Sequence, residues 1–252
     1  MNEILQVAMF AGQMILENGG ETYRVEETIW RICKIYGADE AESFATPTGI
    51  MASICHQGKT YSLTRRVSNR TVNLDKIDKV NDLSRSIQSK KLSVSDFKRE
   101  LDKINNLNTY SFLIVILFSG LAAGSFSILF GGNFKDAFSA FLIGLGIKGL
   151  ALKWRDVGIN TFFINSICGG ITALLPIIFF KLGISSQINQ TIIGSIMLLV
   201  PGLAITNAIR DTMSGDLLSG IIRASEAFLV AISIAVGTGA VLSFWISNLG
   251  GV

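Results

Sequence analysis

Apolar residues recur at helical spacing along the first part of the chain, with polar residues between them. This spacing predicts one helix that ends at Gly19-Gly20 and a second helix that ends at Gly37. The apolar face of the first helix comprises Ile4, Ala8, Ala11 and Ile15. That of the second comprises Val25, Ile29, Ile32 and Tyr36.

The pattern then changes to strands and back to helices. The stretches 42–55 and 59–67 are rich in β-branched and aromatic residues, and the sequence HQGK between them favours a hairpin turn. Two further helical faces follow, and Ser93 with Asp96 predicts the cap of the last helix. These elements predict a small α+β domain over residues 1–108. The two faces are Leu74, Ile77, Val80 and Ile87, and Val94, Phe97, Leu101 and Ile104.

The rest of the chain is a series of long apolar runs. A membrane-spanning helix needs about 20 mainly apolar residues, and five runs approach that length. They predict an all-α membrane domain over 109–252, with helices at about 110–130, 136–152, 159–180, 190–209 and 221–247. These helices are rich in glycine, which favours close helix–helix packing.

Basic residues near the predicted helix ends are distributed unequally between the two sides of the membrane. This asymmetry places the N-terminal domain in the cytoplasm and, with five spans, the C-terminus outside. The side that faces the cytoplasm carries Lys98, Arg99, Lys103, Lys148, Lys153, Arg155, Arg210 and Arg223, and the other side carries Lys135 and Lys181.

Composition agrees with the membrane class. Mean hydropathy is +0.48, and residues 1–110 hold 15 of the 22 Lys and Arg and 14 of the 19 Asp and Glu. No basic, aromatic-interleaved face suggests nucleic acid as a partner. The three cysteines form no CxxC motif and His56 is the one histidine, so we expect no metal site and no cofactor. The acidic residues near the N-terminus argue against a signal peptide.

A first candidate site lies at the predicted start of the second helix. Glu21, Thr22, Arg24 and Glu26 cluster there in the sequence GGETYRVEET. Acids in a first helical turn can simply match the helix dipole, with Arg24 in solvent. The alternative is a small-ligand or hydrolase-like site that uses Glu21 or Glu26 as base.

A second candidate site follows a predicted helix break at Pro201 and Gly202. Proline removes a backbone donor, and broken helices at membrane depth commonly form transport sites. The polar residues beyond the break keep helical spacing, so they share a face. We select as substrate-binding candidates Thr206, Asn207, Arg210, Asp211, Ser214, Asp216, Arg223 and Glu226.

The mixed charge of this second site suits a zwitterion. Arg210 or Arg223 would bind a carboxylate, and Asp211, Asp216 or Glu226 would bind an ammonium group or a coupling proton. The alternative is an ordinary loop whose charges pair internally, for instance Arg223 with Glu226.

An ordered set of motifs resembles the bacterial threonine/serine exporter family, and more closely the longer subunit of its split, two-polypeptide branch. The motifs are GGETYRVEETI, ATPTGI, SLTRRV, VNLDKIDKVNDLSR and PGLAITNAIRDTMSGDLLSGIIRASEA. The resemblance covers Met9 to about Gly239. The family's Pro-Gly…Asn-x-x-Arg-Asp…Ser-Gly-Asp pattern falls on Pro201, Gly202, Asn207, Arg210, Asp211, Ser214, Gly215 and Asp216.

The resemblance implies a secondary exporter in the bacterial cytoplasmic membrane and not an enzyme. Threonine and serine are the expected substrates, with a dicarboxylate such as succinate as the alternative. A smaller membrane protein would supply the missing helices, and a homo-oligomer stays open. Two different functions stay open beside export: a membrane-anchored hydrolase, and a ligand-sensing subunit, each of which would use residues 1–108.

Overall fold

The computed structural model describes residues 1–107 and 110–249 and divides the chain into two compact units. Of the described residues, the first unit combines 1–107 with Gly202–Glu226, and the second combines 110–201 with 227–249. The boundary predicted between residues 108 and 109 lies outside the described residues. The segment after Pro201 belongs to the first unit, although the sequence pattern assigned it to the membrane domain.

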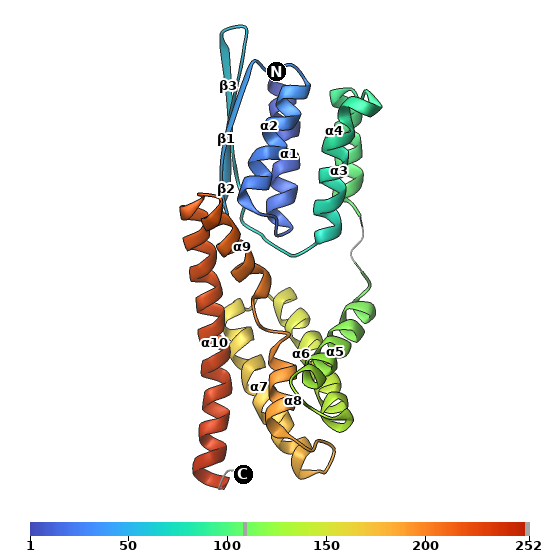
Figure 1. Cartoon of the computed structure of the whole chain (residues 1–252), viewed down its shortest axis with the longest axis vertical. Helices are drawn as coiled ribbons and strands as arrows, with labels where there is room; N and C mark the ends of the chain where they lie inside the picture. Colours follow the sequence, from blue (N-terminus) through green and yellow to red (C-terminus); the bar gives the residue numbers. More distant parts are fainter. Residues whose placement is uncertain (108–109, 250–252) are drawn as a thin grey trace. The chain divides into compact units, whose positions relative to one another are not determined.

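The first unit is built on two N-terminal helices, α1 (Asn2–Glu17) and α2 (Thr22–Ile35), and a three-stranded sheet. Strands β1 (Glu40–Thr46), β2 (Gly49–His56) and β3 (Lys59–Arg66) form an antiparallel meander (Figure 1). The predicted HQGK turn joins β2 to β3, and both Gln57 and Gly58 have positive φ, as in tight hairpins. The first β stretch was predicted as one segment. It is two strands, separated by a turn at Pro47 and Thr48.

Helices α3 (Leu74–Lys90) and α4 (Val94–Asn105) complete the N-terminal part of this unit. The cap predicted at Ser93 is confirmed, because its hydroxyl accepts the backbone N–H of Asp96 at 3.1 Å. The α+β fold of the N-terminal residues therefore follows from local signals that the sequence carries.

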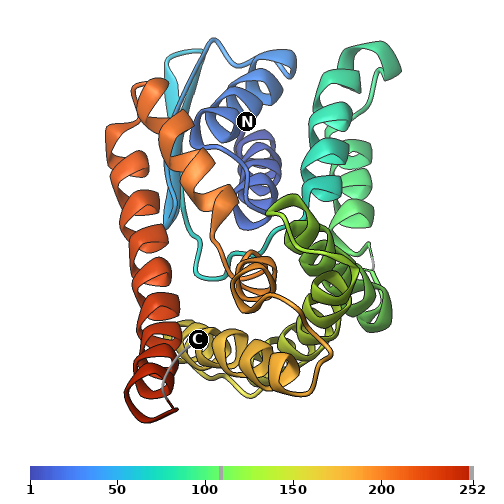
Figure 2. The same cartoon turned by 60° about the horizontal axis from the view of Figure 1, so that its bottom comes forward.

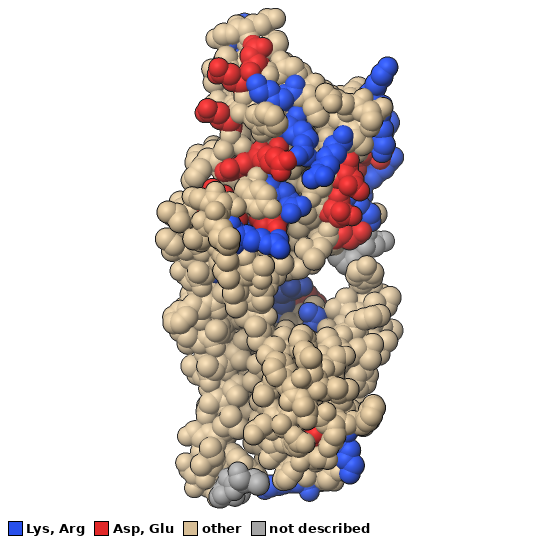
Figure 3. Space-filling view, in the orientation of Figure 1, with Lys and Arg blue, Asp and Glu red and all other residues tan. Residues whose placement is uncertain are grey.

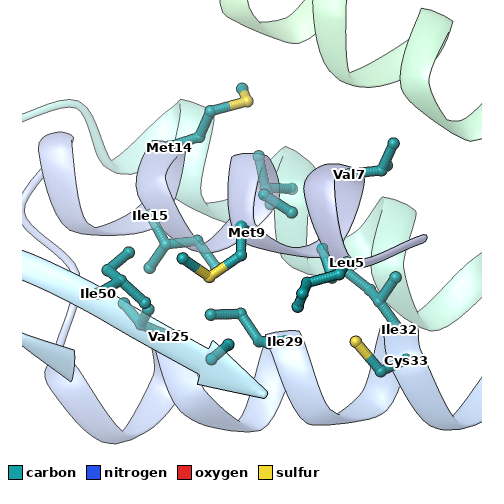
Figure 4. Close-up of a cluster of buried hydrophobic side chains, with 14 of the residues drawn as sticks. Leu5, Val7, Met9, Met14, Ile15, Val25, Ile29, Ile32, Cys33 and Ile50 are labelled. Carbon is teal, nitrogen blue, oxygen red and sulfur yellow. The ribbon is translucent and has the colours of Figure 1, made fainter. Parts of the chain in front are cut away.

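A continuous apolar core lies between α1, α2 and the sheet (Figure 4). Ile29 and Val25 of α2 contact the backbone of α1 so closely that a Cβ at Gly12 would lie 2.7 Å from Ile29 Cδ1. Glycine at this position therefore sets the spacing of the two helices. This packing fixes the start of α2, where the candidate site is found.

The first unit also contains α9 (Gly202–Met213) and the beginning of α10 (Leu217–Leu249). Between them, Gly215 adopts φ +95, the left-handed conformation that glycine takes without strain. The bend turns the chain from α9 into α10 and lets both helices present polar side chains to the same region of the first unit.

The second unit consists of helices α5 (Phe112–Leu129), α6 (Phe134–Asp156), α7 (Thr161–Lys181) and α8 (Ile188–Ile196), together with α10 after Glu226. Helix α8 packs against α5, α6 and α7 (Figures 1 and 2). The face of these helices visible in Figure 3 is almost free of charge, and large apolar side chains such as Leu113, Phe118 and Leu129 are exposed in this unit. Such a surface is suited to lipid.

Four helices of the described residues are long and apolar enough to cross a membrane: Phe112–Leu129, Phe134–Asp156, Thr161–Lys181 and Leu217–Asn248. The helix predicted at 190–209 is two short helices, and the chain breaks at Pro201 as the sequence predicts. Helix α8 ends at Ile196 and α9 begins at Gly202. Pro201 between them has no backbone N–H to continue a helix.

Candidate functional site

The loop that enters α2, residues 18–21, is called the α2 entrance below. It presents two backbone carbonyls to α9 and α10. Gly19 adopts φ +94, which ends α1 and turns the chain into α2. The side-chain amide of Asn207 donates to the Gly19 carbonyl at 2.9 Å, and Arg223 Nη2 donates to the Gly20 carbonyl at 2.7 Å. The two regions that the sequence marked as separate candidate sites are therefore in direct contact within the first unit.

Asp211 is the centre of this contact. Its carboxylate is fully buried; Oδ1 accepts the backbone N–H of Thr22 at 3.0 Å, and Oδ2 accepts the Thr22 hydroxyl at 2.9 Å. Glu21, the N-cap residue of α2, makes no capping bond with its own side chain. Asp211 thus satisfies a free N–H at the start of α2 from a position 189 residues away, and its negative charge matches the helix dipole.

The charge of Asp211 is neutralised by Arg223. Arg223 Nε lies 2.8 Å from Asp211 Oδ2, and both side chains are at least nine-tenths buried. The Nε–H is not aligned for a hydrogen bond, so this contact is an ion pair, and the hydrogen bond of Arg223 goes to Gly20. A buried pair of this kind strongly resists the removal of either partner.

Glu21 lies between two guanidinium groups. Its Oε2 accepts Arg24 Nε at 2.9 Å and its Oε1 accepts Arg210 Nη1 at 2.5 Å. Burial by itself would raise the pKa of Glu21, but its own backbone N–H and the two arginines outweigh burial and lower the pKa. Two cations share one buried carboxylate, so the group carries a net positive charge. Arg210 is 55% exposed and offers further N–H donors to solvent.

Glu26 and Asp216 form an acidic counterpart to this group. Burial raises the pKa of Glu26. The hydrogen bond that its Oε1 accepts from the Ala45 N–H at 2.8 Å lowers this pKa in part, and the negative charges of Asp216 and Asp211 raise it further. Burial is also the main cause that raises the pKa of Asp216, and the negative charge of Asp211 adds to it. Neither carboxylate has a cationic partner within 4.0 Å among residues 1–107 and 110–249.

The structure places the other predicted residues away from this centre. The Thr206 hydroxyl donates to the carbonyl of Gly202 in its own helix, and Ser214 is exposed. The alternative pairing of Arg223 with Glu226 is wrong, since Arg223 pairs with Asp211 and Glu226 pairs with Arg70. In the part of the chain that is described, no group of three potential metal ligands comes together.

The sequence pattern points to most of these residues but not to their partners. In the sequence α2 and α9 look like separate sites, because 189 positions lie between Glu21 and Arg210. Arg70, which binds Glu226 through both guanidinium nitrogens, escaped notice because nothing in its sequence context distinguishes it from other loop residues.

Comparison with known proteins gives a consistent result. The family described as "Putative threonine/serine exporter" matches residues 6–245. The "Probable succinate transporter subunit YjjP" of Klebsiella aerogenes is 26% identical over 92% of this chain and 90% of its own length. The Escherichia coli protein of the same name is 24% identical over 96% and 94%. No solved structure matches the chain significantly.

A third relative carries the family's name. The "Threonine/serine exporter" of Corynebacterium glutamicum is 26% identical over 69% of this chain, a region that makes up 36% of that protein. The family match spans both the α2 entrance and the segment after Pro201. The chain therefore belongs to the threonine/serine exporter family, a family of membrane transporters and not of enzymes.

Proposed function

We propose that this chain is the longer subunit of a two-polypeptide secondary exporter that releases threonine or serine from the bacterial cytoplasm. The observation that carries the proposal is the group formed by Arg24, Glu21 and Arg210. It joins the two candidate regions and leaves guanidinium N–H donors free. Arg is suited to bind a carboxylate through two parallel hydrogen bonds, and threonine, serine and succinate all carry a carboxylate.

Glu26 and Asp216 supply the acidic function of the same site. With a raised pKa and no cationic partner in the described residues, these carboxyls can take up a coupling proton or meet a substrate ammonium group. Asp211 and Glu226, by contrast, are each held by an arginine. We therefore narrow the acids of the transport site to Glu26 and Asp216.

Succinate is the second candidate substrate, and the comparisons favour it specifically. Both relatives named as succinate transporter subunits align with this chain over at least 90% of their length. A dicarboxylate would use Arg24 and Arg210 and would not need an acid for an ammonium group. The role of Asp216 in substrate binding therefore distinguishes the two substrates.

A smaller membrane protein is the proposed partner. The word "subunit" in the names of two relatives supports a second polypeptide. The chain also aligns with only 36% of the Corynebacterium glutamicum exporter, which leaves most of that longer protein unmatched.

The proposed topology has the first unit in the cytoplasm and the C-terminus outside. The segment between α7 and α9 must then cross the membrane as a broken span. Helix α8 has 9 residues, which give about 13 Å at 1.5 Å per residue. Residues 197–199 after it form a hydrogen-bonded turn, in which the Leu199 N–H donates to the Ile196 carbonyl at 2.8 Å. The helix by itself is therefore shorter than the ~30 Å of the hydrocarbon core. Cysteine accessibility at Ser186 and at Asn248 tests this topology, since both should be labelled from outside.

Export of labelled threonine and of labelled succinate from a host without its own exporters tests the function. The chain should be expressed alone, with its smaller partner, and as Arg210→Ala in the pair. We expect export only with the partner and a loss of export in Arg210→Ala. The matched control is Arg66→Ala, which removes an exposed arginine of β3 and should leave export intact.

Two further results decide the coupling and the substrate. A protonophore should abolish export if a proton gradient drives it. Asp216→Asn should reduce threonine export strongly and succinate export less. Export of neither compound by a correctly inserted pair would contradict the proposed substrates.

A further inference from the structure

A polar pocket lies in the first unit, formed by other residues than those of the candidate transport site. It has a volume of about 260 Å³. Successive turns of α1 form one wall of the pocket, and residues of β3 and α4 form the rest. Its main lining residues are Glu3, Val7, Phe10, Arg65, Lys98 and Asp102. Figure 4 shows Val7 pointing away from α2, on the opposite side of α1 from Leu5 and Ile29.

The charges of this pocket do not neutralise one another. Two acids and two bases line it, yet none of the four has an ion-pair partner within 4.0 Å among the described residues. Lys98 and Asp102 are four residues apart on α4, the spacing at which helical ion pairs form. Other charges of α4 do pair, as Arg99 with Asp96 and Lys103 with Glu100. The unpaired charges face the same pocket.

The Arg65 guanidinium is held in place by neighbouring side chains. Its Nη1 donates to Gln13 Oε1 at 2.8 Å, and Gln13 Nε2 donates to Glu17 Oε1 at 2.7 Å. Strand pairing of Arg65 with Ile50 fixes its backbone. A guanidinium oriented in advance loses less conformational freedom when it binds a carboxylate.

We propose that this pocket binds a free α-amino acid, separately from the transport site. Arg65 and Lys98 bind the carboxylate, Glu3 and Asp102 bind the ammonium group, and Val7 and Phe10 contact the side chain. The volume is below that of pockets for drug-sized ligands, about 300–1,000 Å³, and fits a molecule of a few heavy atoms. Equal numbers of both charges favour a zwitterion over a dicarboxylate.

Calorimetric titration of the full-length protein tests this site. L-threonine, L-serine and succinate should be titrated in an Arg24→Ala/Arg210→Ala background, which removes the arginines of the proposed transport site. We expect the two amino acids to bind and succinate not to bind. Loss of a charged hydrogen bond costs about 1.5–3 kcal/mol, so Arg65→Gln and Asp102→Asn should each weaken the Kd roughly 10- to 100-fold.

Matched variants separate this effect from general damage. Arg66→Gln changes the next residue of β3, which is exposed and does not line the pocket, and Asp78→Asn removes an exposed acid of α3. Both should leave the Kd unchanged. The proposal would be overturned if no amino acid bound to the background variant, or if Arg65→Gln and Asp102→Asn left the Kd unchanged. It would also be overturned if succinate bound as tightly as threonine. Export measurements do not enter these criteria, so the proposed function can fail independently.

Discussion

Replacing Asp211 with alanine should destabilise the first unit more than any other single change at the candidate site. The substitution leaves Arg223 buried without its counter-charge and leaves the N–H and hydroxyl of Thr22 without an acceptor. Breaking a buried ion pair by removing one partner costs about 3–5 kcal/mol. For a chain of this length, 1 kcal/mol corresponds to about 2–4 °C in Tm, so we expect a fall of roughly 6 to 20 °C.

The fluorescence of Trp30 can report on the unfolding of the first unit. Trp154 and Trp245 belong to the second unit and would be replaced by phenylalanine in all variants. The matched control is Asp216→Ala, since Asp216 is partly exposed, with no cationic partner among the described residues. Its Tm should stay within about 2 °C of the parent, or rise, because a solvent-accessible acid away from an ion pair contributes little.

A double variant strengthens the test. Arg223→Ala by itself should also lower the Tm, but Asp211→Ala/Arg223→Ala should be less destabilised than the sum of the two single changes, because it leaves no unpaired buried charge. Equal unfolding temperatures for Asp211→Ala and Asp216→Ala would refute the idea that the Asp211 carboxylate stabilises this unit by capping α2 at Thr22.

Two other predictions concern pH and packing. Glu26 has a raised pKa in the folded protein, so the folded state loses stability as the pH rises above the ordinary value near 4.5 and the carboxyl ionises. Glu26→Gln keeps the acceptor for the Ala45 N–H, and its Tm should exceed that of the parent at pH 8 but not at pH 4; a difference independent of pH would contradict this. In the second unit, a Cβ at Gly237 would lie 1.7 Å from the carbonyl oxygen of Ser166, whereas one at Gly239 would meet no atom within 4 Å. Gly237→Ala should therefore lower the yield of folded protein and its Tm through loss of α7–α10 packing, and Gly239→Ala should behave as the parent does in the same size-exclusion and melting assays.

The elements that follow from local signals agree well with the structure. Apolar spacing located α1 to α4, and Gly19, Gly37 and Ser93 marked their ends because glycine turns and serine caps act through the nearest backbone groups. The long apolar runs located α5, α6, α7 and α10 for the same reason. Helix bounds differ by a few residues, as at α6, where a capping box of Asn133 and Asp136 starts the helix at Phe134.

The helix predicted at 190–209 shows the limit of a hydropathy pattern, because it is two helices in the structure. The run at 190–209 is apolar enough to suggest a single span. Pro201 was recognised as a break, but mean apolarity cannot tell whether the chain continues in the same direction after it. The structure ends α8 at Ile196 and assigns α9 to the first unit. The polar face of α9 is satisfied there by the α2 entrance.

The sequence by itself determined the class of this protein, the positions of most of its helices and strands, and the residues of both candidate regions, because each of these depends on neighbours close along the chain. Only the tertiary structure decided which charges meet. It pairs Asp211 with Arg223 and Thr22, Glu21 with Arg210, and Glu226 with Arg70. Such contacts join residues far apart in the chain, and their partners are selected by the packing of whole elements, which no local pattern records.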